Sequence, residues 1–203
     1  LDEIDRGLLR EKLGKDPENL SKLRDRARLL RHENQYDKAV NDYNFIIDMR
    51  PQDIKSRMRR AEIYDKQEKF RLSVQDYTYV IQSEPTNYEA YRNRSEGYYR
   101  LLNYDRCMKD CESLLKAKAF RFDAYATRAK CYQNLGKYRL AINDFTQALR
   151  LKPHWAKGLL YRGKAFKQLK KYVEAYKDFE AAKKLNPNYP ELNKLISEVS
   201  KKF

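Results

Sequence analysis

Five of the six prolines in this chain recur at a fixed interval. Every gap between them is 34 residues or twice that number, at Pro17, Pro51, Pro85, Pro153 and Pro187. Ala119 occupies the slot that is skipped. A period of this length is typical of chains that stack one structural unit repeatedly, and it constrains the fold more than any other feature here. Counted from Leu20, the chain divides without insertion into residues 20–53, 54–87, 88–121, 122–155 and 156–189.

Within each unit, small and large side chains recur at constant positions. One small series is Ala27, Ala61, Ser95, Ala129 and Gly163, and a second is Ala39, Ser73, Cys107, Ala141 and Ala175. Large apolar side chains recur at Leu30, Tyr64, Tyr98, Tyr132 and Phe166. Such positions fall three, four or seven apart within a unit, which is the spacing of an apolar helical stripe. Small residues let two helices approach closely, and one hairpin cannot bury its apolar face alone. Each unit therefore predicts a pair of amphipathic helices that stacks on the next pair.

These series resemble tetratricopeptide (TPR) repeats over residues 20–189. The resemblance implies an all-α fold, namely a right-handed superhelical solenoid of five helix-turn-helix repeats with terminal capping helices. It also implies a role in binding other proteins. The family often has Trp near the start of each unit, where this chain has Leu23, Arg57, Tyr91, Tyr125 and Leu159. The small and aromatic series are unaffected, so the fold prediction stands.

The ends and the third unit depart from the regular pattern. Residues 1–19 predict an N-terminal helix, interpreted as a degenerate half-repeat. Residues 190–203 predict a capping helix, because four apolar residues there have helical spacing, at Leu192, Leu195, Ile196 and Val199. In the third unit Ala119 replaces the proline, and the second helix of that unit is expected to run longer, through Lys118.

Two charged series keep the same period. Arginine occurs at Arg26, Arg60, Arg94, Arg128 and Arg162. Aspartate occurs at Asp42, Asp76, Asp110, Asp144 and Asp178. Residues equidistant from the turn of an antiparallel hairpin lie level with each other, so each arginine should reach the aspartate of its own unit. The hypothesis is a ladder of bidentate pairs that locks the hairpins. The alternative is two solvated faces, although a solvated face would tolerate Lys or Glu at these slots.

TPR solenoids resemble one another in binding ligands on the concave face, which is lined mainly by the first helix of each unit. The resemblance therefore places a partner-binding groove at Arg24, Arg28, Lys55, Arg59, Arg92, Lys130, Lys157 and Lys164. These residues belong to a set of twelve Lys and Arg on this face. The six acidic residues on the same face are Asp25, Glu62, Asp65, Glu89, Glu96 and Asp123. An excess of cations favours an acidic, extended ligand, and an accidental bias of a solvated surface is the alternative.

The sequence holds no pattern typical of catalysis or of a bound cofactor. His32 and His154 lie in different units, and neither has Cys or His at metal-ligand spacing. Cys107 and Cys111 fill core positions of the repeat, so packing is expected there, and a thiolate site with Cys131 is the weaker interpretation. Phosphate loops, nucleophile elbows and zinc-protease motifs are all missing. We therefore predict a protein without enzymatic activity, cofactor or metal.

A clamp for the C-terminal carboxylates of heat-shock chaperones, which some family members carry, is not expected. That clamp needs Lys, Asn, Asn, Lys and Arg at defined places across three units. The best frame in this chain offers Arg24, Arg28, Arg59, Glu89 and Asn93. Glu89 would repel the terminal carboxylate, and Asn93 lacks the required charge.

The leading interpretation is a scaffold or adaptor that captures an acidic or amphipathic segment of a partner protein in the basic groove. A formal charge of +15 suits the glutamate-rich tails of tubulin, so a cytoskeletal or ciliary assembly is a specific version. An odd number of cysteines favours an intracellular, cytoplasmic location, and no apolar run is long enough to predict a membrane span.

Two alternatives stay open. The first is binding of RNA or single-stranded nucleic acid through the basic face, with Tyr99 and Tyr161 stacking on bases. The second is self-assembly, or membership in a longer multidomain chain. Trp155 falls in a turn and is interpreted as a loop staple, with a partner contact as the other possibility.

Overall fold

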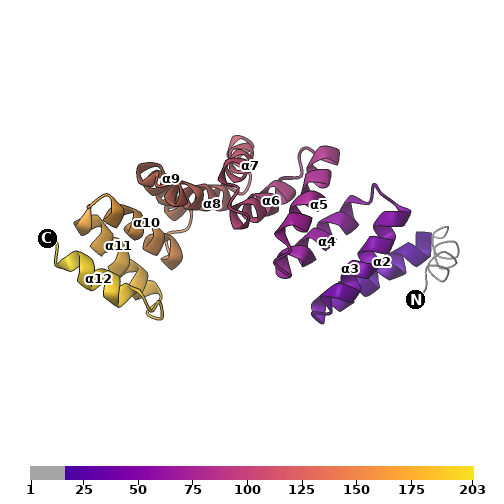
Figure 1. Ribbon diagram of the computed structural model, residues 1–203, viewed down its shortest axis with the longest axis horizontal. Helices are drawn as coiled ribbons and strands as arrows, with labels where there is room; N and C mark the ends of the chain where they lie inside the picture. The colour runs from indigo at the N-terminus through magenta and orange to yellow at the C-terminus, as the bar shows by residue number, and fades with distance from the viewer. Residues whose placement is uncertain (1–16) are drawn as a thin grey trace. The chain divides into compact units, whose positions relative to one another are not determined.

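The computed structural model describes residues 17–203, and over this range the chain consists of helices joined by short turns, without a strand (Figure 1). The helices follow one another as five pairs. They are α2 (Pro17–His32) and α3 (Tyr36–Met49), α4 (Ile54–Lys66) and α5 (Phe70–Ser83), α6 (Tyr88–Arg100) and α7 (Tyr104–Lys116), α8 (Arg121–Asn134) and α9 (Tyr138–Leu151), and α10 (Ala156–Gln168) and α11 (Tyr172–Leu185). A last helix, α12 (Leu192–Ser200), follows them. The predicted all-α, helix-turn-helix class is confirmed, whereas the half-repeat expected within residues 1–19 falls almost wholly outside the described residues.

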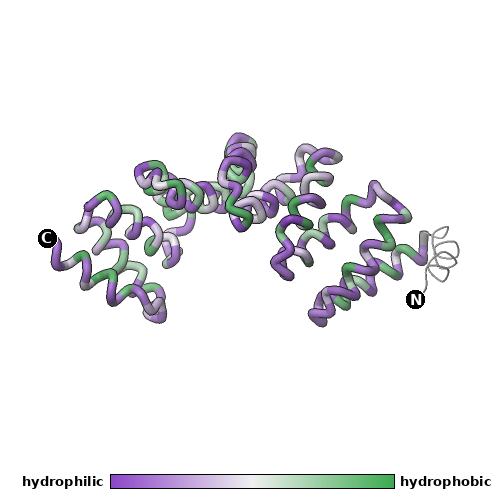
Figure 2. The backbone as a smooth tube through the Cα atoms, in the orientation of Figure 1, coloured by the Kyte–Doolittle hydropathy of each residue, from purple (hydrophilic) through white to green (hydrophobic). Residues whose placement is uncertain are grey.

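The chain forms two compact units, Leu1–Gly97 and Tyr98–Phe203. In the N-terminal unit α2 packs on α3, α3 on α4, and α4 on α5, around fully buried rings at Tyr43 and Tyr77. In the C-terminal unit each helix from α7 to α12 packs on the next, and Phe145 and Phe179 take the same core position. Figure 2 shows apolar and polar residues interspersed along every helix, as expected where only one stripe faces the core.

Small residues allow these rings to enter the helix pairs. The members of the first small series in the two outermost pairs, Ala27 and Gly163, face rings or aliphatic side chains of the partner helix. A Cβ atom added to Gly163 would lie 2.6 Å from the ring of Phe179. Any larger side chain at this position would push the ring out of the core.

The turn inside each pair relies on a left-handed residue at the same place in every repeat. At this place the residues with positive φ are Asn34, Glu68, Leu102, Gly136 and Lys170. The next residue then donates its backbone N–H to the helix five residues earlier, as in Gln35 to the Leu30 carbonyl at 2.8 Å. Only one of these five residues is glycine, so this left-handed turn cannot be recognised in the sequence from the residue type alone.

The turn after α7 is where the sequence prediction was wrong. The helix ends at Lys116 and does not continue through Lys118, which has a φ of +55°. In the other repeats a proline forces the preceding residue into an extended conformation, as at Glu84. Ala119 retains a backbone N–H and donates it to the Leu114 carbonyl at 2.9 Å, which closes a left-handed helix end.

The charged series come together in space. Both guanidinium nitrogens of Arg60 reach the carboxylate of Asp76, at 2.8 and 2.6 Å. The same two-bond geometry joins Arg26 to Asp42, Arg128 to Asp144, and Arg162 to Asp178. Asp110 of the third repeat is buried like the other four aspartates. Each such pair links the first helix of a repeat to the second helix of the same repeat.

A second bond of the same arginines was not foreseen. Arg60 also donates to Asn44 at 2.7 Å, Arg94 to Thr78 at 3.1 Å, and Arg162 to Thr146 at 3.1 Å. Each acceptor lies on the second helix of the preceding repeat. These three arginines therefore also link neighbouring repeats.

The predicted capping segment, residues 190–203, contains α12. Leu192 and Val199 are buried against the core formed by α10 and α11, and Leu195 and Ile196 pack beside them. Lys164 and Lys167 on α10 form ion pairs with Glu191 and Glu198 of this segment. The apolar face of the last repeat is therefore covered.

Replacing Ala119 by proline, which would restore the periodic residue, is expected to destabilise the chain. The change removes the N–H of the half-buried Ala119 that bonds the Leu114 carbonyl and conflicts with the left-handed Lys118, and the loss of one backbone hydrogen bond alone costs about 1 kcal/mol. Urea unfolding followed by circular dichroism would measure the loss. The matched control is Pro85→Ala at the equivalent slot, for which a much smaller change is expected. Equal stability of the Ala119→Pro variant and the parent would contradict this account of the turn.

The exposure of the ladder arginines predicts unequal costs of breaking a pair. Asp144→Asn should lower the free energy of unfolding by about 3 kcal/mol, because Arg128, with 19% of its side chain exposed, loses its counter-charge in a largely buried position. Asp42→Asn should lower the free energy of unfolding by less than about 1 kcal/mol, because the side chain of Arg26 is 63% exposed and its charge remains hydrated. Equal losses for the two variants in urea unfolding would show that burial does not set the strength of the ladder.

Candidate functional site

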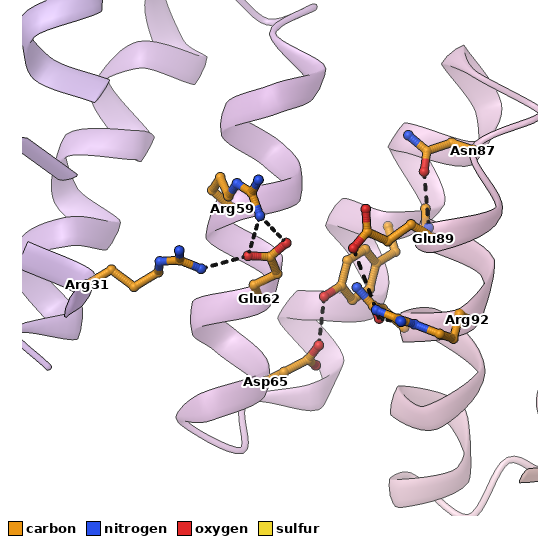
Figure 3. Close-up of polar contacts among 10 residues, drawn as sticks. Arg31, Arg59, Glu62, Asp65, Asn87, Glu89 and Arg92 are labelled. Carbon is orange, nitrogen blue, oxygen red and sulfur yellow. Dashed lines mark hydrogen bonds and ion pairs between the residues drawn. The ribbon is translucent and has the colours of Figure 1, made fainter. Parts of the chain in front are cut away.

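Side chains of the first helices form an open pocket of about 600 Å³ in the N-terminal unit. Arg31 of α2, Glu62 and Asp65 of α4, and Glu89 and Arg92 of α6 line it (Figure 3). Each of these residues lies on the helix face that the resemblance assigned to ligand binding. This pocket is thus the part of the predicted groove that the N-terminal unit forms by itself.

Three arginines around this pocket lie against carboxylates. Glu62 accepts hydrogen bonds from Arg31 at 2.9 Å and from Arg59 at 2.7 and 2.9 Å, and so joins α2 to α4 (Figure 3). Arg92 lies 3.6 Å from Glu89 on the same helix. These arginines are therefore less available to an acidic ligand than the sequence suggested.

Other predicted groove cations of the N-terminal unit differ in their surroundings. Arg24 donates to Asp53 at 2.5 Å, and Asp53 also caps α4 by accepting from the Ser56 backbone N–H at 2.9 Å. Arg28 lies 4.0 Å from Asp25, with both side chains mostly exposed. Lys55 is exposed. The structure thus brings most of these cations next to acidic residues of the same or the next repeat.

Asp65 differs from the other carboxylates of the pocket. Its Oδ2 accepts a hydrogen bond from the hydroxyl of the fully buried Tyr77 at 2.7 Å, whereas its Oδ1 is inaccessible to water and accepts no hydrogen bond. Burial raises the pKa of Asp65, the hydroxyls of Ser73 and Tyr77 act in the opposite direction, and the nearby carboxylates of Glu62 and Glu96 raise the pKa further. Burial next to Asp65 also raises the pKa of Tyr77. No cation forms an ion pair with Asp65 among the described residues.

The net charge of the chain lies almost entirely in the C-terminal unit. Residues 1–97 contain 20 Lys and Arg against 19 Asp and Glu, whereas residues 98–203 contain 24 against 10. The C-terminal unit thus accounts for 14 of the 15 net positive charges. Asp144, Asp178, Glu191 and Glu198 of this unit each form an ion pair with Arg or Lys.

The predicted groove cations of the C-terminal unit lie on α8 and α10. The Lys130 ammonium lies 4.4 Å from the ring centre of Tyr99, and that of Lys157 lies 5.8 Å from the ring centre of Tyr161. Lys164 is bound to Glu191 at 2.8 Å. Lys130 and Lys157 occupy the same repeat positions as Arg28 and Lys55 in the N-terminal unit, three repeats earlier.

The aromatic residues proposed to stack on bases are engaged within the protein. The hydroxyl of Tyr99 accepts from Asn134 at 3.3 Å, and its ring packs against Tyr104. Tyr161 stacks on Phe145, with ring centres 5.9 Å apart. Neither ring is thus an unoccupied stacking surface.

Trp155 is a packing residue. It meets Phe122 edge to face, with ring centres 5.0 Å apart, and a Cβ added to Gly158 would lie 2.0 Å from its ring. Glycine at 158 thus makes room for the indole, which fastens the turn between α9 and α10 to α8.

The cysteines and histidines form no metal site in the part of the chain that the structure describes. Cys107, Cys111 and Cys131 are buried thiols, and the sulfurs of Cys107 and Cys131 lie 3.1 Å apart. Hydrogen bonding with its neighbour Cys111 raises the pKa of Cys107, which disfavours the reactive thiolate. No described helix has the length and apolar character needed to cross a membrane.

Comparison with known proteins supports the repeat assignment. Residues 122–154 and residues 156–189 each match a family model described as a tetratricopeptide repeat. No curated protein matches the chain.

Solved structures with the same fold are distant in sequence. The crystal structure of MamA protein is 16% identical over 83% of this chain and 92% of that chain, with a TM-score of 0.76. MamA from residue 41 to its end, from Desulfovibrio magneticus RS-1, is 13% identical over 84% and 97%, with a TM-score of 0.78. YrrB, described as a TPR protein with an unusual peptide-binding site, is 13% identical over 96% and 97%, with a TM-score of 0.74. At these identities the likeness shows a shared fold.

The surroundings of Asp65 predict a specific pH dependence of stability. A carboxyl whose pKa is raised by folding stabilises the folded state most when it is protonated, and this contribution is lost as the pH rises through the raised pKa. The free energy of unfolding of the parent, relative to Asp65→Asn, should therefore fall between about pH 4 and neutral pH. Urea unfolding at a series of pH values would measure it. Tyr77→Phe, which removes the bond that lowers this pKa, should move the fall to higher pH, and parallel profiles for all three proteins would contradict the assignment.

Proposed function

This chain belongs to the tetratricopeptide repeat family, and from that premise we propose that it captures an acidic segment of a partner protein on the first-helix face of its C-terminal unit. The family membership accounts for protein binding by stacked helix pairs. The charge of the C-terminal unit supports an acidic partner, and that observation carries the proposal.

The support is electrostatic. With 24 Lys and Arg against ten Asp and Glu, residues 98–203 have a formal charge of +14, which attracts a run of Asp or Glu. Lys130 and Lys157 contribute to this charge from the face that lines the predicted groove. In the N-terminal unit the carboxylates nearly equal the cations in number, so the same face there offers little attraction. The proposed binding site therefore comprises only the part of the predicted groove that lies in the C-terminal unit.

A glutamate-rich tubulin tail is one partner with this chemistry, and an assembly at the cytoskeleton or the cilium is the corresponding proposal for location. The support is the charge alone. Sedimentation of the protein with microtubules, but not with microtubules whose tails have been removed, is the expected result.

The test uses a matched pair of charge reversals. The probe is a fluorescent peptide of ten glutamates, with a peptide of ten glutamines as the control for charge. Lys130→Glu/Lys157→Glu should weaken binding of the glutamate peptide by roughly tenfold or more, because both cations face the ligand. Arg28→Glu/Lys55→Glu makes the same change in charge at the equivalent repeat positions and should have a much smaller effect. Fluorescence anisotropy at two salt concentrations would measure both, and binding should weaken as salt rises.

Two outcomes would overturn the proposal. Equal weakening by the two double variants would show that the total charge, and not the C-terminal unit, decides binding. Tighter binding of a ten-nucleotide uridine oligomer than of the glutamate peptide would favour the nucleic-acid alternative, which the engaged rings of Tyr99 and Tyr161 do not support.

A further inference from the structure

Two carboxylates of the C-terminal segment already occupy cations on the first-helix face. Glu191 accepts hydrogen bonds from the Lys164 ammonium at 2.8 and 2.9 Å. Glu198 accepts a hydrogen bond from Lys167. Both lysines lie on α10, the first helix of the last repeat, whereas Glu198 belongs to α12 and Glu191 is the N-cap residue of that helix. The chain itself thus presents to this face the carboxylate chemistry that we propose for its ligand.

The contact from Lys167 to Glu198 has an equivalent between the first two repeats. Lys167 and Glu198 are 31 residues apart, and so are Arg31 and Glu62. The two carboxylates differ in exposure, because the side chain of Glu62 is 19% exposed and is shared by two arginines, whereas that of Glu198 is 39% exposed. Partly exposed ion pairs of a flexible lysine are readily exchanged, so the pair on α12 is the weaker of the two.

The apolar side chains of α12, and not its ion pairs, hold this helix in place. It packs on α11 at the C-terminal end of the chain (Figure 1). Leu192 and Val199 are 1% and 0% exposed in the core formed with α10 and α11. Burial of two aliphatic side chains stabilises the docked helix more than partly exposed ion pairs do. Each carboxylate can therefore leave its lysine while α12 stays docked.

An incoming carboxylate has room beside these two lysines. A pocket of about 280 Å³ is lined by Lys164 and Lys167, together with Gln133 of α8 and Leu195 of α12. Both lysine side chains are 31% exposed. The two ammonium groups are therefore accessible to a ligand on the first-helix face.

Lys194 is placed to receive the carboxylates when they leave. It lies three residues after Glu191 and four before Glu198, so the three side chains share one face of α12. Lys194 is exposed and forms no ion pair among the described residues. The hydrogen bond from Lys167 lowers the pKa of Glu198, and the charges of Lys167 and Lys194 lower it as well. A second cation thus already acts on the carboxylate that Lys167 holds.

We propose that Glu191 and Glu198 compete with the acidic partner for the two lysines of α10. In the free protein the two glutamates occupy these lysines, and a partner segment extends onto α10 by displacing them. This competition rests on the proposed function and names the residues that regulate it.

Internal competition of this kind favours partners with a dense run of acidic residues. A carboxylate on the same chain has a high effective concentration, so a single carboxylate of a ligand displaces it poorly. A run of Asp or Glu contacts Lys130 and Lys157 at the same time, and these further contacts offset the exchange at α10. The expected partner therefore carries several consecutive acidic residues.

The test uses the whole chain and the ten-glutamate peptide. Glu191→Gln/Glu198→Gln should bind this peptide about fivefold or more tightly than the parent, because two cations become available to it. The matched control is Glu112→Gln/Glu174→Gln, which makes the same change in charge at exposed positions of the second helices α7 and α11. It should change the affinity by less than about twofold, since distant exposed charges are screened by salt. An unchanged affinity of the first variant, or an equal gain in the control, would overturn the proposal.

Two further measurements separate displacement from a general effect of charge. When both lysines of α10 are replaced by glutamine, the glutamate substitutions should no longer raise the affinity, because no cation is released. In the parent, nuclear magnetic resonance titration with the glutamate peptide should shift the carboxyl carbons of Glu191 and Glu198, and this measurement requires no substitution. Unshifted carboxyl signals at saturation, or a gain in affinity that persists without the two lysines, would contradict displacement.

The proposed function and the internal competition fail in different ways. Peptide binding that depends on Lys130 and Lys157 but not on Glu191 and Glu198 would overturn the competition alone. Absence of binding by the parent and by every variant would overturn the proposed function and the competition with it.

Discussion

The periodic arginine is the side chain that joins the two helices of a repeat to each other, through its aspartate, and in three repeats it also joins them to the preceding repeat. Arg60, for example, holds Asp76 across its own pair and donates a third bond to Asn44 of the preceding repeat. One guanidinium can do this because its donors are arranged in a rigid plane with two usable edges. A lysine at the same place would supply a charge but could not reproduce both contacts. The strict recurrence of arginine and aspartate is thus explained by geometry as well as by charge.

Because these ten charges cancel, the remaining ones decide which surfaces attract a ligand, and the two units use them differently. In the N-terminal unit, groove cations meet carboxylates of the next repeat, as Arg31 meets Glu62. These ion pairs neutralise the groove cations and add further links between repeats. In the C-terminal unit 24 Lys and Arg stand against ten Asp and Glu, so the carboxylates are too few to balance the cations. The excess positive charge is therefore not spread along one continuous groove but belongs mainly to the C-terminal unit.

Departures from the repeat carry most of the information that is specific to this protein. Ala119 in place of proline changes a turn, because an alanine N–H can close a left-handed helix end that a proline cannot. Asp65, where other repeats place a cation, a tyrosine or an amide, is a half-buried carboxyl bonded by the hydroxyl of Tyr77. Both positions are plain in the sequence once the period is known, since each breaks a series. Their consequences depend on neighbours that the period does not reveal.

The sequence by itself determined the helix pairs, their core residues and the partners within the arginine–aspartate ladder. All of these follow from periodicity, because residues at one repeat position face the same kind of neighbour in every repeat. Only the tertiary structure decided the end of α7, the bonds from Arg60 to Asn44 and from Arg31 to Glu62, and the bond from Tyr77 to Asp65. These features depend on which side chains of adjacent repeats meet at hydrogen-bond distance, and on whether water reaches them. A spacing of 34 residues brings two repeats together but does not say which of their charges cancel.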